Sequence, residues 1–259
     1  MAPRAFMATL HQLRDARLYA LLHRGNPGDV DFYLRRCRGV RHVLELGVGA
    51  GRVAGPLVCS GVPVTGVDTH AGLLELASRD IGEMNGTGFR GVAVDMRSFE
   101  LDLQFDRIVI PYSGLFCLLD AADVQSCLSR CRQHLTLGGR LVFDVYEADS
   151  FHAACDPDAF DASEREHVVD VMDGETRLSV FEHSTWDKSA QRLDMTYEYL
   201  DAQGQVVHAS CVRHRYWLLD QFAPTLAEAG LAIETLHGGF AGQPPGPDAD
   251  VIVVEARAV

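Results

Sequence analysis

The sequence lacks any long uninterrupted apolar run. Although 47% of its 259 residues are hydrophobic, no stretch approaches the roughly 18 uncharged apolar residues that a membrane-spanning helix requires. Basic residues are scarce beside acidic ones, with 23 Lys and Arg against 36 Asp and Glu, and the formal net charge is -13. Such a chain has no basic surface on which to neutralise a nucleic-acid backbone. We therefore expect a protein that binds neither a membrane nor nucleic acid.

The sequence also lacks the cysteine patterns of disulfide frameworks and zinc sites. Its cysteines are odd in number and scattered, and none forms a CxxC pair. Cys127 and Cys131 lie four residues apart on an expected helix, but no second pair of ligands stands at a matching spacing. The seven are Cys37, Cys59, Cys117, Cys127, Cys131, Cys155 and Cys211. We expect no metal, buried free thiols, and a reducing, cytoplasmic location.

The N-terminal segment has neither the apolar core nor the cleavage site of a secretory signal. It carries arginines and no acidic residue before Asp15, so an organellar transit peptide stays open. Its leucines at positions 10, 13, 18, 21 and 22 recur at helical spacing. We interpret the segment as the first helix of the fold.

Short β-branched runs alternate with helical segments between residues 41 and 146, which predicts a parallel sheet covered by helices on both faces. The expected strands cover 42–47, 63–68, 89–95, 105–111 and 139–146. Gly138 and Gly139 suit the C-cap of the preceding helix. Two terminal strands, 231–240 and 248–258, are expected to form an antiparallel hairpin on the sheet edge. The fold class is thus α/β, a doubly wound, mostly parallel seven-stranded sheet with a C-terminal antiparallel hairpin.

The hydrophobic pattern of the sequence changes after residue 150. Segments 176–186, 191–200 and 206–217 are separated by the turn-forming stretches DKSA and DAQGQ. In 191–200 apolar and polar residues alternate, which predicts an antiparallel meander with one packed and one exposed face. We assign 151–215 to this inserted antiparallel β meander, a lid on the substrate side, and 1–150 with 216–259 to the core domain.

A glycine-rich turn, LELGVGAG, follows the first expected strand. A nicotinamide dinucleotide usually requires GxGxxG, because its pyrophosphate lies against the backbone at a helix N-terminus. Here the glycines stand at 47, 49 and 51, and Arg52 occupies the place of the last glycine. The spacing argues against a dinucleotide, and we expect Arg52 to be an ordinary residue of the first helical turn.

The pattern E-x-G-x-G-x-G that begins at Glu45 resembles motif I of the class I S-adenosylmethionine-dependent methyltransferases. The resemblance covers most of the chain: Asp68 and Asp95 end the next two strands, FDRIVIPYSGLF follows, and the terminal order is helix, strand, strand. It implies a methyltransferase enzyme with S-adenosyl-L-methionine as cofactor, and a Rossmann-like fold.

The resemblance also implies roles for single residues. Asp68 would accept hydrogen bonds from the ribose hydroxyls, Asp95 would bind the adenine amino group, and the backbone of Met96 would meet an adenine ring nitrogen. Tyr19 stands where this family places a helix that closes over the cofactor, although ordinary helix packing explains it equally well. The full expected cofactor-binding set is Tyr19, Glu45, Gly47, Gly49, Gly51, Asp68, Thr69, Asp95, Met96 and Pro111.

The residues after the fourth strand bear on the methyl acceptor. Nucleic-acid amino-methyltransferases carry Asn/Asp-Pro-Pro-Tyr there, whereas this chain has Ile110, Pro111, Tyr112 and Ser113. The missing polar residue and the acidic composition favour a small-molecule acceptor, methylated on nitrogen, oxygen or carbon by in-line displacement. The insertion resembles, in architecture only, the lid of the glycine, sarcosine and amino-sugar N-methyltransferases.

A hydroxyl or carbon acceptor needs a general base, whereas a neutral amine does not. We select Tyr112, His183 and His214 as catalytic candidates, with His208 as a further histidine on the same strand face as His214. Surface or packing roles stay open for each of them.

Two alternatives to catalysis with S-adenosylmethionine stay open. One is an NAD(P)-dependent oxidoreductase, and the other is a non-catalytic S-adenosylmethionine-binding module. The expected partner is a small-molecule substrate, and a homodimer is compatible with the sequence.

Overall fold

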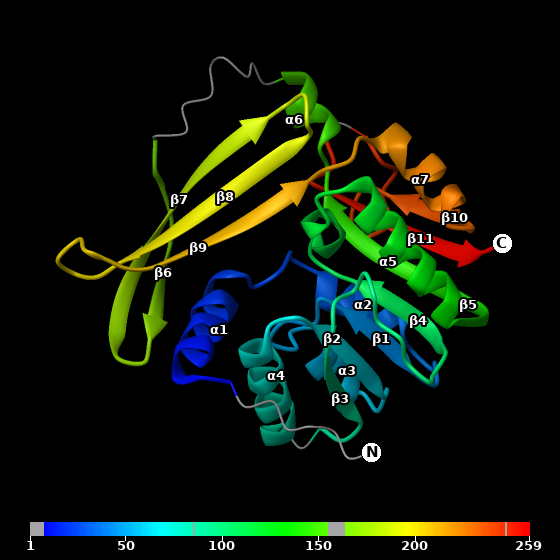
Figure 1. The fold of residues 1–259 in the computed structure, drawn as a ribbon, viewed down its shortest axis with the longest axis horizontal. Helices are drawn as coiled ribbons and strands as arrows, with labels where there is room; N and C mark the ends of the chain where they lie inside the picture. Colours follow the sequence, from blue (N-terminus) through cyan, green and yellow to red (C-terminus); the bar gives the residue numbers. More distant parts are fainter. Residues whose placement is uncertain (1–7, 85, 155–163, 247) are drawn as a thin grey trace.

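The core of the protein is a seven-stranded sheet in the order β10-β11-β5-β4-β1-β2-β3 (Figure 1). A computed structural model describes residues 8–84, 86–154, 164–246 and 248–259. The parallel strands are β1 (Val43–Leu46), β2 (Val64–Asp68), β3 (Phe89–Ala93), β4 (Phe105–Ile110) and β5 (Leu135–Tyr146). β11 (Val251–Ala258) runs antiparallel to both β5 and β10 (Leu231–His237). The predicted α/β fold class with its terminal antiparallel hairpin is therefore confirmed.

Helices cover both faces of this sheet because its strands are apolar on both faces. The helices are α1 (Leu10–Leu22), α2 (Asp29–Arg36), α3 (Ala54–Cys59), α4 (Ala71–Glu83), α5 (Ala121–His134), α6 (Asp149–Ala154) and α7 (Phe222–Glu228). Short 3₁₀ helices span Gly114–Cys117 and Leu219–Gln221. Ile108 and Ile110 of β4 face the α5 and α7 side, whereas Val109 between them faces α2 and α3. None of the helices among the described residues is long and apolar enough for a membrane span.

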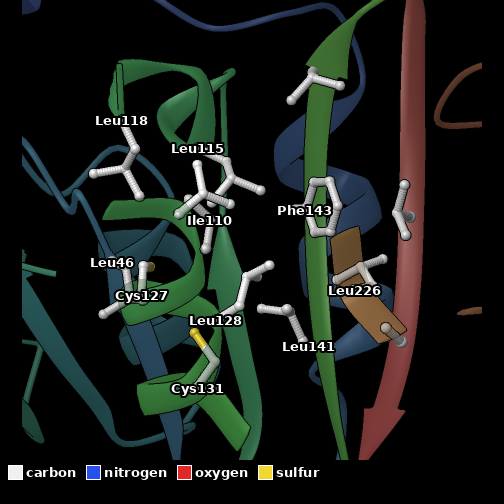
Figure 2. Close-up of a cluster of buried hydrophobic side chains, with 14 of the residues drawn as sticks. Leu46, Ile110, Leu115, Leu118, Cys127, Leu128, Cys131, Leu141, Phe143 and Leu226 are labelled. Carbon is white, nitrogen blue, oxygen red and sulfur yellow. The ribbon is translucent and has the colours of Figure 1, made fainter. Parts of the chain in front are cut away.

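The core cluster beneath α5 is shown in Figure 2. Cys127, Leu128 and Cys131 of α5 lie among leucines and Ile110 of the sheet. These two cysteines and Cys37 are buried free thiols, as predicted. The prediction is wrong for Cys59, Cys117 and Cys211, which are exposed, and Cys155 lies outside the described residues.

A second, four-stranded antiparallel sheet extends away from the core (Figure 1). Its strands are β6 (Glu166–Asp173), β7 (Thr176–Asp187), β8 (Arg192–Leu200) and β9 (Val206–Arg215), in that order. All four lie within the residues that we assign to the insertion. The helix α1 lies between this second sheet and α4, since Leu18 packs on Val180 and Tyr199 while Ala16 packs on α4.

Three local features differ from the sequence predictions. The helix α5 ends at His134 and the chain passes directly into β5, so the predicted cap at Gly138 and Gly139 is wrong and both glycines lie inside the strand. The strand β6 and the helix α2 were not predicted. β6 packs Val171 on the second sheet but exposes Val168 and Met172, which obscures its alternating pattern.

Candidate active site

One cavity of about 1010 Å³ lies between the C-terminal ends of the core strands and the second sheet. Its glycine-turn half is lined by Glu45, Gly47, Gly49, Asp68, Thr69, Asp95 and Met96. Its second-sheet half is lined by His23, Tyr112, Tyr146, Met195, Tyr197, Val212 and His214. Ligands of open parallel sheets bind at this edge, so the cavity is the candidate active site.

The glycine turn after β1 has a backbone that other residues rarely adopt. Gly47, Gly49 and Gly51 have φ values of 67°, 53° and 80°, in the left-handed region that glycine tolerates best. Gly47 and Gly49 line the cavity. Gly51 is not among the residues that line it; a Cβ there would come within 3.1 Å of Ala77 and Ile81 on α4. We therefore correct its expected role from cofactor binding to close packing of the turn on α4.

Asp68 fixes this turn from the end of β2. Its Oδ2 accepts a hydrogen bond from the Gly49 amide at 2.9 Å, and its Oδ1 accepts one from the His70 amide at 2.8 Å. Carboxylate oxygens can accept further bonds, and Asp68 and Thr69 both line the cavity. The position matches the ribose-binding role that the family resemblance implies.

Asp95 lies two residues beyond β3, which ends at Ala93, so the predicted strand 89–95 is too long. The guanidinium of Arg97 holds both carboxylate oxygens, at 2.9 Å from Oδ1 and 2.7 Å from Oδ2, and lowers the pKa of Asp95. Arg97 also binds Asp123 at 2.7 Å. The carboxylate lines the cavity with Met96, but a ligand would share it with Arg97.

A buried acidic cluster lies beneath the glycine turn. Glu45 is 2% exposed, its Oε2 has no partner among the described residues, and burial raises its pKa to about 8. Asp29 is equally buried and forms an ion pair with Arg52 at 2.7 Å. Arg52 lines the cavity and lies 5.5 Å from the centroid of the Tyr112 ring. It is therefore not the ordinary helical residue that we expected: it precedes α3, which begins at Ala54, and neutralises part of the acidic cluster.

The turn after β4 holds Tyr112 in a strained conformation. Tyr112 and Ser113 have φ values of 56° and 58°; this conformation costs about 1–3 kcal/mol per residue and persists only where neighbours enforce it. Asp144 of β5 does so, because its Oδ1 accepts hydrogen bonds from the Tyr112 amide at 3.0 Å and the Tyr33 hydroxyl at 2.6 Å. Burial raises the pKa of Asp144 to about 6. Pro111 and Tyr112 both line the cavity.

The end of α1 closes over the glycine turn. Tyr19 lines the cavity, and a Cβ on Gly49 would lie 3.9 Å from its ring. His23, the C-cap of α1, lies 4.2 Å from the Tyr19 ring and 5.4 Å from the Tyr197 ring, centroid to centroid. Burial lowers the pKa of His23 to about 4. The helix thereby joins the two halves of the cavity.

The predicted histidines on the second sheet lie on opposite faces. His214 lines the cavity, and burial lowers its pKa to about 4. His183 pairs with Thr196, whose neighbours on β8, Met195 and Tyr197, line the cavity. Because successive residues of a strand point to opposite faces, His183 faces away from the cavity, and we withdraw it as a catalytic candidate.

His208 shares the strand face of His214 but lies farther along it. It contacts Tyr199 and stands 3.5 Å from Asp15 of α1. It is not among the residues that line the cavity, so we do not retain it as a base either.

Several cavity residues were missed by the sequence reasoning. They are His23, Arg52, Tyr146 and Tyr197, with Asp144 and Tyr33 directly behind Tyr112. Only Asp144 carried a signal, as an acidic residue inside the apolar strand LVFDVY.

Buried polar atoms without a partner are concentrated around this cavity. Apart from atoms in ion pairs, the described residues contain seven such side-chain atoms, on His23, Glu45, Asp144, Tyr146, His183, His214 and Thr235. Four of these residues line the cavity: His23, Glu45, Tyr146 and His214. An unpaired buried polar group costs about 1–3 kcal/mol, so a polar ligand that pairs with these atoms would be bound favourably.

Glu45→Gln should remove a pH-dependent loss of stability. The native pKa of about 8 lies above the ordinary value of 4.5, so the native state keeps a proton that the unfolded state releases. The wild-type free energy of unfolding should therefore fall as pH rises from about 4.5 to 8. Urea unfolding at pH 5 and pH 8 measures the free energy of unfolding of both proteins. Relative to the wild type, the variant should be more stable at pH 8 than at pH 5. The exposed Glu83→Gln is the control, and a difference independent of pH for Glu45→Gln would contradict the burial argument.

Comparison with known proteins identifies a methyltransferase domain in this chain. Residues 43–139 match the family model described as a methyltransferase domain. A candidate methyltransferase of Geobacillus sp. (strain WCH70) is 24% identical over 222 residues, which are 85% of each chain. The solved structure of the CcbJ methyltransferase from Streptomyces caelestis is 24% identical, with a TM-score of 0.77, over 91% of this chain and 97% of that one.

A further similar structure contains the cofactor. It is S-adenosylmethionine-bound CalS10, an amino pentose methyltransferase from Micromonospora echinaspora, 18% identical with a TM-score of 0.62 over 98% of this chain and 99% of that one. The match of residues 43–139 confirms the predicted methyltransferase enzyme class, the solved structures confirm the predicted fold, and both favour this class over the oxidoreductase alternative. Residues 43–139 are a methyltransferase domain, and the chain as a whole has the class I fold of the S-adenosylmethionine-dependent small-molecule methyltransferases.

Proposed function

We propose that this methyltransferase transfers the methyl group of S-adenosylmethionine to the nitrogen of a small-molecule amine. One observation carries the proposal: a single cavity joins the glycine turn and Asp68 to a second half whose histidines are neutral at physiological pH. The residues fit the cofactor, because buried Glu45 has an unpartnered side-chain oxygen at the glycine turn, and a cationic group of the cofactor beside it would favour the ionised carboxylate. When bound, S-adenosylmethionine supplies an electrophilic methyl group on a sulfonium.

The residues of the chain have defined tasks in this proposal. Asp68 and the glycine turn hold the ribose and methionine portions, while Asp95 and Met96 contact the adenine. Tyr19 covers the turn and excludes water. Tyr112, held in place by Asp144, aligns the acceptor, since alignment is the main contribution that a protein makes to an in-line displacement.

The low basicity of the cavity histidines supports nitrogen as the acceptor atom. A hydroxyl must lose its proton to attack, and an imidazole with a pKa of about 4 is a poor base for that step. A neutral amine attacks with its lone pair, and the product ammonium can release its proton afterwards. The similar CalS10 acts on an amino pentose, a substrate that contains an amine, and this is consistent with an amine acceptor here.

The composition supports the remaining parts of the proposal. A net charge of -13 favours a small-molecule partner over nucleic acid. The six described cysteines are free, which suits a reducing cytoplasmic location.

Methyl transfer to a panel of primary and secondary amines tests the proposal. With methyl-labelled cofactor, mass spectrometry should detect an N-methylated product and an equal amount of S-adenosylhomocysteine. An O-methylated product, or release of S-adenosylhomocysteine without any methylated amine, would contradict the proposed N-methylation.

A further inference from the structure

Three neutral polar side chains surround the second-sheet half of the cavity. His23 caps α1, Tyr146 ends β5 and His214 lies on β9. The His214 ring stacks on the Tyr146 ring at 5.7 Å between centroids. The pKa of His214 is lowered mainly by burial and, to a smaller extent, by the nearby His23. Each of the three has a buried polar atom without a partner among the described residues: His23 Nε2, Tyr146 Oη and His214 Nδ1.

None of these groups carries a charge at neutral pH. Burial lowers the pKa of both imidazoles to about 4 and raises the pKa of the Tyr146 hydroxyl. Neutral donors and acceptors are best matched by neutral groups of a ligand, such as hydroxyls and amine N–H groups.

Two of the three arginines that line the cavity are already paired with aspartates. Arg52 pairs with Asp29 at 2.7 Å, and Arg97 pairs with two aspartates. The Nε of Arg24 donates to the carbonyl of Leu21 at 2.9 Å. A carboxylate on the acceptor would therefore have to compete with aspartates for Arg52 or Arg97, whereas the exposed Arg24 offers it only a solvent-screened charge.

We propose that the acceptor is an amine with a hydroxyl on a neighbouring carbon, recognised by His23, Tyr146 and His214. This inference rests on the proposed function and narrows its substrate class. His23 lies next to Tyr19, which covers the glycine turn, so it accepts the N–H of the reacting amine. Tyr146 and His214 bind the neighbouring hydroxyl. Amines that are purely apolar, or that carry a carboxylate, are poorer substrates.

Three probes with the same ring separate these substrate classes. They are cyclohexylamine, trans-2-aminocyclohexanol and 2-aminocyclohexanecarboxylate, each assayed for N-methylation by mass spectrometry. For the wild type, kcat/KM for the amino alcohol should exceed that for cyclohexylamine about tenfold, since two groups bind the hydroxyl and each hydrogen bond contributes about threefold. The carboxylate should be the poorest substrate.

Tyr146→Phe and His214→Phe should each reduce the preference for the hydroxyl to about threefold, because each variant removes one of the two hydrogen bonds. Tyr146→Phe deletes one oxygen that has no protein partner, so its fold should be retained, as circular dichroism can verify. His183→Phe is the matched control: it also removes an unpartnered ring nitrogen, but from the face away from the cavity, and should keep the tenfold preference.

The outcomes distinguish this inference from the proposed function. Methylation of the amines without a preference for the hydroxyl would overturn recognition of the acceptor by His23, Tyr146 and His214, and so would a preference that both variants retain. Either result would remain consistent with the proposed N-methylation. A wild type that methylates no amine of the probe set or the wider panel would overturn the proposed function as well.

Discussion

Replacing Asp68 with alanine should weaken the binding of S-adenosylhomocysteine about 100-fold. The carboxylate holds the Gly49 amide and is proposed to accept the ribose hydroxyls. Hydrogen bonds to a charged group contribute about 1.5–3 kcal/mol each, and a loss of about 3 kcal/mol corresponds to a factor of about 100 in affinity. Isothermal titration calorimetry measures the change directly, and far-UV circular dichroism should show an unchanged fold.

Asp95→Ala is the comparison for this experiment. Both carboxylate oxygens of Asp95 are already held by Arg97, so its removal frees a guanidinium as well as deleting an acceptor. We expect a loss of affinity below about tenfold, since at most one ligand hydrogen bond is removed. If Asp68→Ala stayed within threefold of the wild type, the ribose site would lie elsewhere.

Arg52→Met should destabilise the protein by about 3 kcal/mol at pH 8, because breaking a buried ion pair leaves an uncompensated charge. Arg52 is the partner of Asp29, and its charge also lowers the pKa of Glu45 and Asp144. Methionine keeps the apolar stem of the side chain, so the lost charge dominates the effect. Urea unfolding measures the difference.

A second substitution supplies the control for the ion pair. Adding Asp29→Asn to Arg52→Met removes the orphaned carboxylate, and at least half of the lost stability should return. A single variant as stable as the wild type, or a double variant with no recovery, would contradict the assignment of Arg52 as the counter-charge of the acidic cluster.

The glycine-turn half of the site could be predicted because strand ends fix it. Gly47, Asp68 and Asp95 each follow a strand whose apolar pattern is visible in the sequence, and parallel strands bring their carboxyl ends to one edge. The tertiary partner of each residue was not visible. Gly51 packs on α4 and Asp95 is paired with Arg97, although the family resemblance gave both of them cofactor roles.

The second-sheet half could be predicted only in part. Period-two alternation places His183 and His214 on opposite faces once the pairing of β7, β8 and β9 is known. The sequence does not contain that register, so both histidines were equal candidates. His23 was invisible because its role depends on where α1 lies, between α4 and the second sheet.

Calorimetric titration with S-adenosylhomocysteine and with NADH determines whether this cavity binds a methyl-donor cofactor. The glycine spacing, Asp68 and the buried Glu45 predict one-to-one binding of S-adenosylhomocysteine with micromolar or tighter affinity, and no binding of NADH. Tight binding of NADH without binding of S-adenosylhomocysteine would contradict the assignment of the cavity to S-adenosylmethionine.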